Sequence, residues 1–377
     1  MDYVLHITDE CNFRCKYCYE NKCNKKLSFE NIKSLINIIA QNKEKNPTLT
    51  FYGGEPLLEK EIIYKTVEYV REIEKKEDVK FNFKINTNGY LIDDDFLEFA
   101  ERNDFYFCYS IDGNKEAHDA NRVTAGGIGT FDIVKENAKK VLDAKVKIVA
   151  MMVVNRNNIE YLGESVRYLF SLGFENVLFA LDYSDKWIDS DLEIIKREYL
   201  KLSELYYEKT MNEDSFYMFP FENKIDAYIS EKKRCLMECN LGYKSVNIST
   251  DGKVYPCMQL VDNSNYVIGD CVNGIDVEKR ANLKKVEEYE VCKECLIKDR
   301  CKHTCACVNK LSTGDVTQLS PFVCETERII IEIADEVANR LYKAESSMFL
   351  HKKYNKMYPL IDMLERKMKN EHKAGER

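Results

Sequence analysis

Short apolar segments alternate with longer amphipathic segments over the first half of the chain. Stretches rich in β-branched and aromatic residues predict six strands, at residues 3–8, 49–52, 81–86, 105–111, 146–154 and 176–180. Apolar residues at helical spacing predict helices between them, at residues 29–42, 62–75, 94–102, 131–144 and 159–172. This alternation predicts an α/β fold with a parallel sheet. Six strands fit an open wound sheet or an incomplete barrel, and the periodicity does not separate the two.

The alternation stops after about residue 180. A charged helical segment follows at residues 191–211, and beyond it the chain is crowded with cysteine. We therefore predict a first domain at residues 1–225, a cysteine-rich domain at residues 230–325 and a helical extension at residues 326–377. Apolar residues recur at helical spacing where the extension begins, so we expect a helix that packs against the rest of the protein.

The composition is that of an ordinary folded protein, with 377 residues, 45% hydrophobic and 32% charged. The first residues lack the basic and then apolar layout of a secretory signal, so we expect reduced thiols and a cytoplasmic location. No apolar run approaches the roughly 18 residues of a membrane span. The net charge of -8 supplies no basic surface for nucleic acid. Membranes and nucleic acid are therefore excluded as expected partners.

Three cysteines, Cys11, Cys15 and Cys18, follow the first predicted strand directly. Three soft thiolates suit zinc or an iron–sulfur cluster. A structural zinc site requires four ligands, and Cys23 is available as the fourth. If only three cysteines hold a four-iron cluster, one iron keeps an open position for a substrate or cofactor. The spacing alone leaves both alternatives open.

Glycine and polar residues follow the next three strands. They are Gly53-Gly54-Glu55-Pro56, Thr87-Asn88-Gly89 and Ser110-Ile111-Asp112-Gly113. The carboxyl ends of parallel strands meet at one edge, so these residues should lie near the cysteines. Glycine lets a ligand approach the main chain, Glu55 can accept hydrogen bonds from an amine, and Ser110 with Asp112 suits the vicinal hydroxyls of a sugar. Any one of these segments could be a plain turn, but three in succession predict a binding edge.

The spacing Cys11-x3-Cys15-x2-Cys18, with Tyr17 before the last cysteine, and the sequence Gly53-Gly54-Glu55-Pro56 together resemble the radical S-adenosylmethionine superfamily. The resemblance implies a partial (βα)6 TIM-like barrel. It implies that the three cysteines hold a [4Fe-4S] cluster whose fourth iron binds S-adenosylmethionine, which is cleaved to a 5'-deoxyadenosyl radical. By position, it assigns contacts with S-adenosylmethionine to Tyr17, Gly53, Gly54, Glu55, Asn88, Ser110, Asp112 and Arg122.

Eight further cysteines have the numbers and spacing for two four-thiolate sites of zinc or iron–sulfur type. The pattern Cys239-x12-Gly252-x4-Cys257, then Cys292-x2-Cys295-x5-Cys301-x3-Cys305, then Cys324 resembles the SPASM domain. The resemblance implies two auxiliary [4Fe-4S] clusters, so that the protein would carry three in all. It assigns Cys235, Cys239, Cys257 and Cys305 to the first, and Cys292, Cys295, Cys301 and Cys324 to the second. Because Cys235 lies outside the seven-cysteine pattern, an open iron in the first cluster is the alternative.

Among the remaining cysteines, Cys108 is predicted to be a buried strand thiol. Cys271 and Cys307 either approach a cluster or substrate, or are free structural thiols.

Together the two domains resemble radical S-adenosylmethionine/SPASM maturases of peptides and proteins. One branch makes thioether or carbon–carbon links in ribosomally made peptides, and another oxidises cysteine or serine of sulfatases to formylglycine. In the sulfatase branch, an aspartate follows the cysteine of the Tyr-Pro-Cys motif and accepts a substrate proton. Here Met258 follows Tyr255-Pro256-Cys257 and cannot act as a base. We therefore expect a thioether-forming peptide maturase, with the sulfatase and carbon–carbon branches as alternatives.

The expected partners are a cysteine-containing precursor peptide and an electron donor such as flavodoxin or ferredoxin. Because the first cluster cysteine is already residue 11, we expect the precursor's leader to bind another surface or a separate protein. A hypothesis of a different class is a non-catalytic zinc or iron–sulfur scaffold, which would not cleave S-adenosylmethionine.

Overall fold

The computed structural model describes residues 1–144, 146–230, 241–283, 289–302 and 304–355, together with Met357, Tyr358 and Ile361. Within these residues, one sheet has the strand order β11-β10-β9-β8-β1-β2-β3-β4-β5-β6-β7. The strands are β1 (Asp2–Thr8), β2 (Thr48–Gly53), β3 (Asn82–Thr87), β4 (Tyr106–Ser110), β5 (Lys147–Val154), β6 (Asn176–Leu181), β7 (Tyr217–Phe219), β8 (Ser245–Ile248), β9 (Lys253–Tyr255), β10 (Gly269–Asp270) and β11 (Gly274–Ile275).

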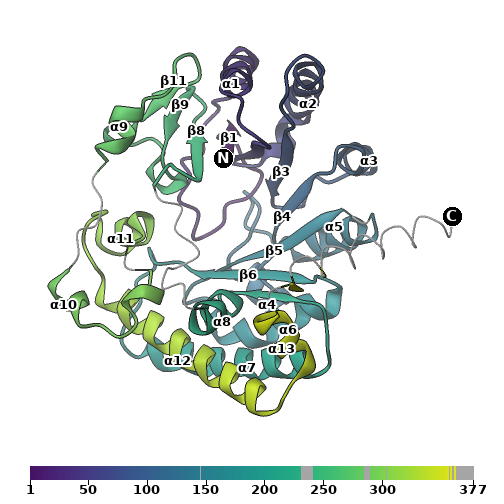
Figure 1. The fold of residues 1–377 in the computed structure, drawn as a ribbon. Coiled ribbons are helices and arrows are strands. Elements are labelled where there is room, and N and C mark those ends of the chain that lie inside the picture. Colours follow the sequence, from purple (N-terminus) through teal and green to yellow (C-terminus); the bar gives the residue numbers. More distant parts are fainter. Residues whose placement is uncertain are drawn as a thin grey trace.

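Helices connect the parallel strands and cover the outside of the curved sheet (Figure 1). In the first half they are α1 (Phe29–Gln41), η1 (Pro56–Glu59), α2 (Lys60–Glu74), α3 (Asp94–Arg102), α4 (Lys115–Asp119), α5 (Phe131–Asp143), η2 (Ile159–Tyr161) and α6 (Leu162–Leu172). In the second half they are α7 (Asp191–Met211), α8 (Phe221–Ile229), η3 (Met258–Leu260), η4 (Ser264–Tyr266), α9 (Val277–Ala281), α10 (Glu290–Lys293), η5 (Lys298–Arg300), α11 (Ala306–Thr313), α12 (Pro321–Lys343) and α13 (Ser347–Tyr354).

The sheet is an incomplete barrel. Each of β1 to β6 pairs in parallel with the next strand, ending at β7, while β7 and β11 are the two edges. The expected α/β fold, its partial barrel and all six predicted strands are confirmed. Three phenylalanines, from β2, from β3 and from the position before β4, form a buried stack. They are Phe51, Phe83 and Phe105, and their ring centroids are 5.4 to 6.4 Å apart. Burial of such side chains contributes roughly 1.5 to 3 kcal/mol each to folding.

The cysteine-rich region shares the sheet of the barrel. Strand β8 pairs in parallel with β1, with Asp2 opposite Ser245 and Leu5 opposite Ile248. Strands β9, β10 and β11 then continue the sheet in antiparallel fashion. The expected boundary near residue 230 therefore falls between elements of one continuous sheet. The three-part division of the chain stays a prediction.

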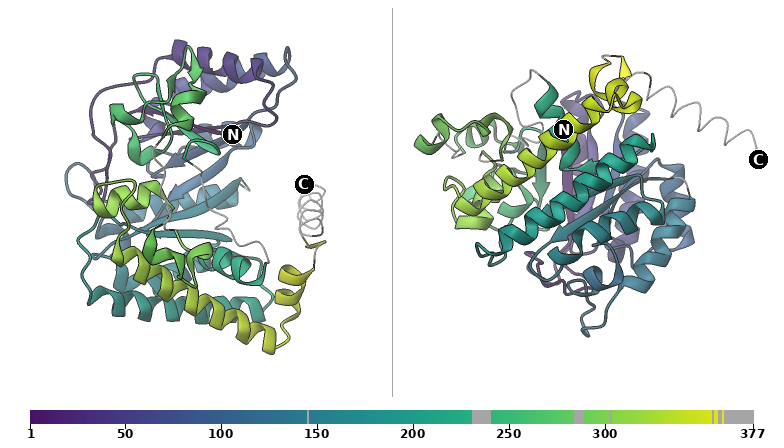
Figure 2. Two further views of the ribbon diagram at one scale, coloured as in Figure 1. Left: turned by 60° about the vertical axis from the view of Figure 1, so that its left-hand side comes forward. Right: turned by 90° about the horizontal axis from the view of Figure 1, so that it is seen from below.

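The expected helix after residue 325 is confirmed as part of α12, which lies alongside α7 on the outside of the barrel (Figure 2). No helix in the described part of the chain has the length and apolar character needed to cross a bilayer.

Helix α13 is fixed to this layer by a buried ion-pair cluster. The Lys353 ammonium, whose side chain is 4% exposed, contacts the Glu222 carboxylate, and Lys352 Nζ lies 2.8 Å from Glu222 Oε1. The Tyr206 hydroxyl donates to Glu222 Oε2 at 2.7 Å. Burial opposes ionisation of Glu222, but the two lysines outweigh it and lower the pKa of Glu222 to about 2.

Because this pKa is depressed on folding, ionised Glu222 stabilises the fold above its unfolded pKa, and the contribution is lost as pH falls toward 2. We predict that Glu222→Gln lowers the free energy of unfolding by about 3 kcal/mol at pH 7, because the buried Lys353 ammonium keeps only Asp226 as a carboxylate partner and Lys352 loses Glu222. The difference from wild type should shrink in denaturant titrations below pH 4. The control Glu204→Gln removes an exposed partner of Arg340 and should cost at most about 1 kcal/mol. Equal losses in the two variants would contradict the assignment.

Candidate functional site

The loop that carries the first three cysteines is fixed along its length by backbone hydrogen bonds. At its ends, Thr8 bridges Lys26 and Asp9 N donates to Lys25 O at 3.0 Å. In its middle, Arg14 N donates to Val123 O at 2.7 Å and Lys16 N donates to Asn121 O at 3.1 Å. Phe13 is buried in the core beneath the loop. The loop is therefore held at the carboxyl end of β1, against residues 121–124.

Cys11 and Cys15 are half-buried on this loop, and Cys18 is exposed. Burial raises the pKa of Cys11, and it raises that of Cys15 to about 12. These thiols are therefore protonated near neutral pH unless a bound metal favours the thiolate. Three soft ligands on one fixed loop fit a four-iron cluster, in which each thiolate binds a different iron.

The zinc alternative would require Cys23 as the fourth ligand. Within the described residues, no three histidine, cysteine or acidic side chains converge closely enough to hold one metal ion. The exposed Cys23 thiol instead donates to Asp9 Oδ2 at 3.2 Å.

The glycines after β2 permit close packing of two loops. Gly54 N donates to Thr8 O, and Glu55 N donates to Glu10 O, each at 2.8 Å. A Cβ on Gly53 would lie 2.2 Å from Thr8 O, and one on Gly54 would lie 2.0 Å from Glu10 O. The immediate neighbour of these glycines is thus the cysteine loop itself. Their expected contact with a cofactor stays a prediction.

The Glu55 carboxylate joins the loops after β2 and β3. Its Oε1 accepts from Thr87 Oγ1 at 2.7 Å and from Leu57 N at 3.0 Å, while Oε2 accepts from Asn88 N at 2.8 Å. Burial raises the pKa of Glu55 to about 7, although these hydrogen bonds oppose the shift. The protein's own donors therefore already engage this carboxylate, and its contact with an amine stays a prediction.

Asn88 reaches from this network to the cysteine loop. Its Nδ2 donates to Asn12 Oδ1 at 2.8 Å and lies 3.9 Å from Cys11 Sγ. The Nδ2 atom of Asn12 is buried without a hydrogen-bond partner in the described structure.

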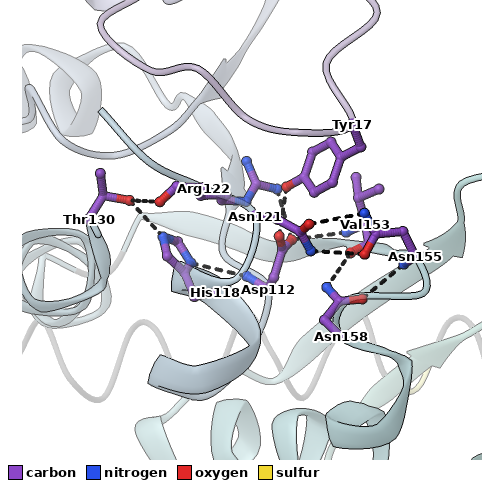
Figure 3. A network of polar contacts seen from close by, with 9 residues as sticks. All are labelled: Tyr17, Asp112, His118, Asn121, Arg122, Thr130, Val153, Asn155 and Asn158. Atoms are coloured by element: carbon purple, nitrogen blue, oxygen red, sulfur yellow. Dashed lines mark hydrogen bonds and ion pairs between the residues drawn. The ribbon is translucent and has the colours of Figure 1, made fainter. Parts of the chain in front are cut away.

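A second network surrounds Asp112 (Figure 3). The Tyr17 hydroxyl donates to Asp112 Oδ2 at 2.6 Å. Arg122 and the backbone N–H of Val153 each donate to Asp112 Oδ1 at 3.0 Å. Asp112 is fully buried, so it joins the cysteine loop to β5 and to the segment after α4. Ser110, its expected partner in ribose binding, is half-buried at the end of β4.

The buried ring of His118 hydrogen-bonds to the backbone of Asp112 and to the side chain of Thr130. The Asp112 N–H donates to His118 Nδ1 at 3.3 Å, and His118 Nε2 lies 3.0 Å from Thr130 Oγ1. Burial lowers the pKa of His118 well below its ordinary value, so the ring is neutral. The hydrogen-bond pattern then places the ring proton on Nε2, where it donates to Thr130.

Sequence reasoning missed a group of asparagines beside the network. The amides of Asn121 and Asn155 exchange two hydrogen bonds of 3.0 Å, and Asn158 Oδ1 accepts from Asn155 N at 2.9 Å (Figure 3). Asn155 and Asn158 follow β5 directly, so the edge rule used for the three preceding strand ends could have found them.

The second set of cysteines is described in part, because Cys235 and Cys239 lie outside the described residues. Burial raises the pKa of Cys324, and the nearby thiols of Cys292 and Cys295 raise it further. These three members of the expected second auxiliary site therefore lie close enough to interact. Cys301, the fourth, is buried.

Cys257 and the residue that follows Cys305 belong to one small apolar cluster or pack against it. Leu241, Leu260, Ala306 and Val316 form the cluster, and Cys257 packs against it. Cys305 precedes Ala306 at the start of α11. The ligand roles of both sets of cysteines stay predictions.

Two of the remaining thiols have clear environments. Cys108 is half-buried rather than buried, because it alternates with Phe107 and Tyr109, which face the core. Burial raises its pKa to about 11. Cys271 is fully buried, and burial raises its pKa to about 12, so it is an inert thiol.

Comparisons with known proteins agree with this architecture. Residues 5–169 match the model of the Radical SAM superfamily. A cysteine-type anaerobic sulfatase-maturating enzyme of Clostridium perfringens is 25% identical over 350 residues, which cover 86% of this chain and 93% of that protein. The radical SAM cyclopropyl synthase TigE of Paramaledivibacter caminithermalis is 22% identical over 375 residues, which cover 92% of this chain and 74% of that protein.

Solved structures share the fold. The structure of anSMEcpe with bound AdoMet and Cp18Cys peptide superposes with a TM-score of 0.77 at 21% identity, over 91% of this chain and 99% of that one. Streptococcus suis SuiB bound to precursor peptide SuiA superposes with a TM-score of 0.63 at 16% identity, over 86% of this chain and 75% of that one. Residues 5–169 thus match the Radical SAM superfamily, and the chain as a whole is similar in sequence to anaerobic sulfatase-maturating enzymes and has the fold of anSMEcpe.

Proposed function

We propose that this chain is a radical S-adenosylmethionine enzyme that modifies a peptide or protein. Cys11, Cys15 and Cys18 would hold a [4Fe-4S] cluster with one iron open to S-adenosylmethionine. The observation that carries the proposal is the fixed loop of three thiols at the carboxyl end of β1, together with a Cys23 thiol that donates to Asp9. When bound and reduced, the cluster supplies the electron that cleaves S-adenosylmethionine to a 5'-deoxyadenosyl radical.

Two buried donors support a ligand at this mouth. Asn12 Nδ2 and Arg122 Nε have no hydrogen-bond partner in the described structure. A buried donor without a partner costs about 1 to 3 kcal/mol, which acceptor atoms of a ligand would recover. Arg122 is therefore proposed to bind a carboxylate of S-adenosylmethionine through Nε while its other nitrogen holds Asp112.

The other rim residues are proposed to act in two ways. Ser110, Gly53, Gly54, Glu55 and Asn88 stay proposed contacts of S-adenosylmethionine. Asp112 is proposed to act as a positioning residue, because its oxygens are taken by Tyr17, Arg122 and the chain itself. It holds Tyr17, and therefore the cysteine loop, in place at the carboxyl end of the barrel strands.

Two auxiliary [4Fe-4S] clusters are proposed in the cysteine-rich region, with Cys235, Cys239, Cys257 and Cys305 as ligands of the first. Cys292, Cys295, Cys301 and Cys324 would bind the second. The electrostatic proximity of Cys292, Cys295 and Cys324 supports the second set, and the packing of Cys257 beside α11 supports the first.

The proposed product is a cysteine thioether crosslink in a ribosomally made precursor peptide. In each link a carbon gives up a hydrogen atom, a thiol gives up a proton and one electron passes to an auxiliary cluster. Met258, which begins η3, has no acid–base function and supports this branch over formylglycine formation. Carbon–carbon linkage is an alternative product. A reduced flavodoxin or ferredoxin, and a separate leader-binding protein, are proposed partners.

Formylglycine formation is the second candidate, and a specific observation favours it. Relatives that cover most of this chain are named cysteine-type anaerobic sulfatase-maturating enzymes. That activity would require a proton acceptor other than residue 258.

We predict that protein purified without oxygen holds about twelve irons in three clusters and releases 5'-deoxyadenosine when S-adenosylmethionine and dithionite are added. Cys15→Ala should abolish nucleoside release and remove about four irons, because only the loop cluster loses a ligand. Cys23→Ala is the matched control and should change neither quantity. Iron and sulfide analysis with chromatography of the nucleoside measures all three proteins. Zinc without nucleoside release would instead support a non-catalytic scaffold.

We predict that Gly54→Ala displaces the cysteine loop, because its Cβ would lie 2.0 Å from Glu10 O. The free energy of unfolding should fall by about 1 to 3 kcal/mol, as in other overpacked sites, and iron bound at the loop should be lost. Gly126→Ala is the control, since its Cβ would lie 3.8 Å from Thr124 Oγ1. Loss of iron from both variants, or from neither, would argue against loop packing as the cause.

We predict that co-expression with a cysteine-rich peptide encoded nearby yields a product lacking two hydrogens per link. Tandem mass spectrometry should place each link between a sulfur and a carbon atom. Formylglycine in a sulfatase-like peptide would transfer the assignment to the second candidate.

A further inference from the structure

A buried ion pair between α8 and α12 binds the backbone on both sides of Cys301. Lys224 Nζ lies 2.6 Å from Glu327 Oε2, and these side chains are only 5% and 2% exposed. The Lys224 ammonium also donates to Arg300 O at 2.7 Å. The N–H of Lys302 donates to Glu327 Oε2 at 3.0 Å. The residues directly before and after Cys301 are therefore both bound by this pair.

Arg300 and Lys302 attach this segment further. The Arg300 guanidinium pairs with Asp335 of α12, with Nη1 2.8 Å from Oδ2, and it donates to Lys224 O at 3.1 Å. Lys302 Nζ lies 5.7 Å from the ring centroid of Phe219, the last residue of β7. The segment around Cys301 is thus attached to α12 and to the edge of the barrel.

Helix α12 also carries Cys324, which lies near its start, three residues before Glu327. Residues at this spacing are neighbours on one side of a helix. The thiols of Cys292 and Cys295 interact electrostatically with that of Cys324. Glu327 therefore connects the segment of Cys301 to the helix of Cys324, and all four expected ligands of the second auxiliary site lie in described segments.

We propose that Glu327 is a positioning residue, which fixes Cys301 at the place that a second auxiliary cluster requires relative to Cys324. The proposal rests on the proposed function, which supplies that cluster. Before Cys301 the chain makes only the single turn η5, which is too short to hold its direction alone. Movement of this segment would leave Lys224 and Glu327 buried with fewer partners, so the ion pair opposes it.

An ion pair that served stability alone would behave like that of Glu222. The Glu222 carboxylate of α8 is 3% exposed and pairs with Lys352 and Lys353. Both lysines lie on α13, which contains no cysteine. The same substitution at Glu222 and at Glu327 therefore separates the loss of a buried ion pair from the loss of contact with the neighbours of Cys301.

The iron content of the full chain, purified without oxygen, tests the proposal without reference to activity. Glu327→Met removes the acceptor of the Lys302 N–H, whereas Glu327→Gln keeps a side-chain oxygen for it. Wild type, Glu327→Gln and Glu222→Met should each hold about twelve irons, and Glu327→Met should hold about eight. Equal iron contents in Glu327→Met and Glu222→Met would overturn the proposal, as would equal iron losses in Glu327→Gln and Glu327→Met.

The reduction potential gives a second readout, which uses only variants that keep the size of the side chain. The Glu327 carboxylate accepts from the peptide N–H that follows Cys301, so Glu327→Gln removes a negative charge beside the second cluster. Because reduction adds negative charge, the midpoint potential of one auxiliary cluster should rise. Glu222→Gln should leave every potential unchanged.

Redox titration followed by electron paramagnetic resonance measures these potentials. An unchanged potential in Glu327→Gln, or the same shift in Glu222→Gln, would overturn the proposal. A wild-type protein without iron would instead disprove the proposed function, and this result is distinct from the others.

Discussion

The buried carboxylate of Asp112 is the interaction on which the rest of the site depends. A charge that is fully removed from water must be paired, and here Arg122, Tyr17 and the Val153 N–H share that role. These partners come from the segment after α4, the cysteine loop and β5, which are remote in the sequence. Phe13 of the loop is buried in the core and Cys11 and Cys15 pack against it, while this polar junction and the backbone hydrogen bonds beside it fix the rest of the loop.

The second constraint is steric, and it reinforces the first. Gly53 and Gly54 allow the loop after β2 to press against Thr8 and Glu10, and Glu55 then ties this loop to the loop after β3. Because hydrogen bonds and close packing already hold the cysteine loop and the loops after β2 and β3, these loops lose little conformational entropy when a cofactor binds. Such preorganisation matters for radical chemistry, because the reactive group must be formed beside the hydrogen that it removes.

Six strands and the helices between them could be predicted from the sequence, because their apolar residues recur at the spacing of a strand or of a helix. Strands β7 and β8 were missed because they have only three and four residues, too few for a period to show. Closure into a partial barrel depends on pairing partners, which periodicity does not reveal. At the site, Glu55 and Asp112 were found at strand ends and Arg122 by resemblance, but the sequence did not predict that Glu55 binds the loop after β3 or that Arg122 binds Asp112. The direction of a loop side chain depends on neighbours that fold from elsewhere in the chain, as the missed pairing of Asn121 with Asn155 illustrates.

The pairing of β8 with β1 bears on how the two cysteine regions work together. His6 Nε2 lies 3.3 Å from Asn247 Oδ1, and Thr250 Oγ1 donates to Asp9 Oδ2 at 2.9 Å, so side chains reinforce the shared sheet. Burial lowers the pKa of His6 to about 4, and the neutral ring keeps this contact at physiological pH. Regions joined in this way cannot approach or separate as hinged domains would. The distance from the cysteine loop to Cys257 is therefore a property of the sheet, because Cys257 follows β9, which continues that sheet beyond β8.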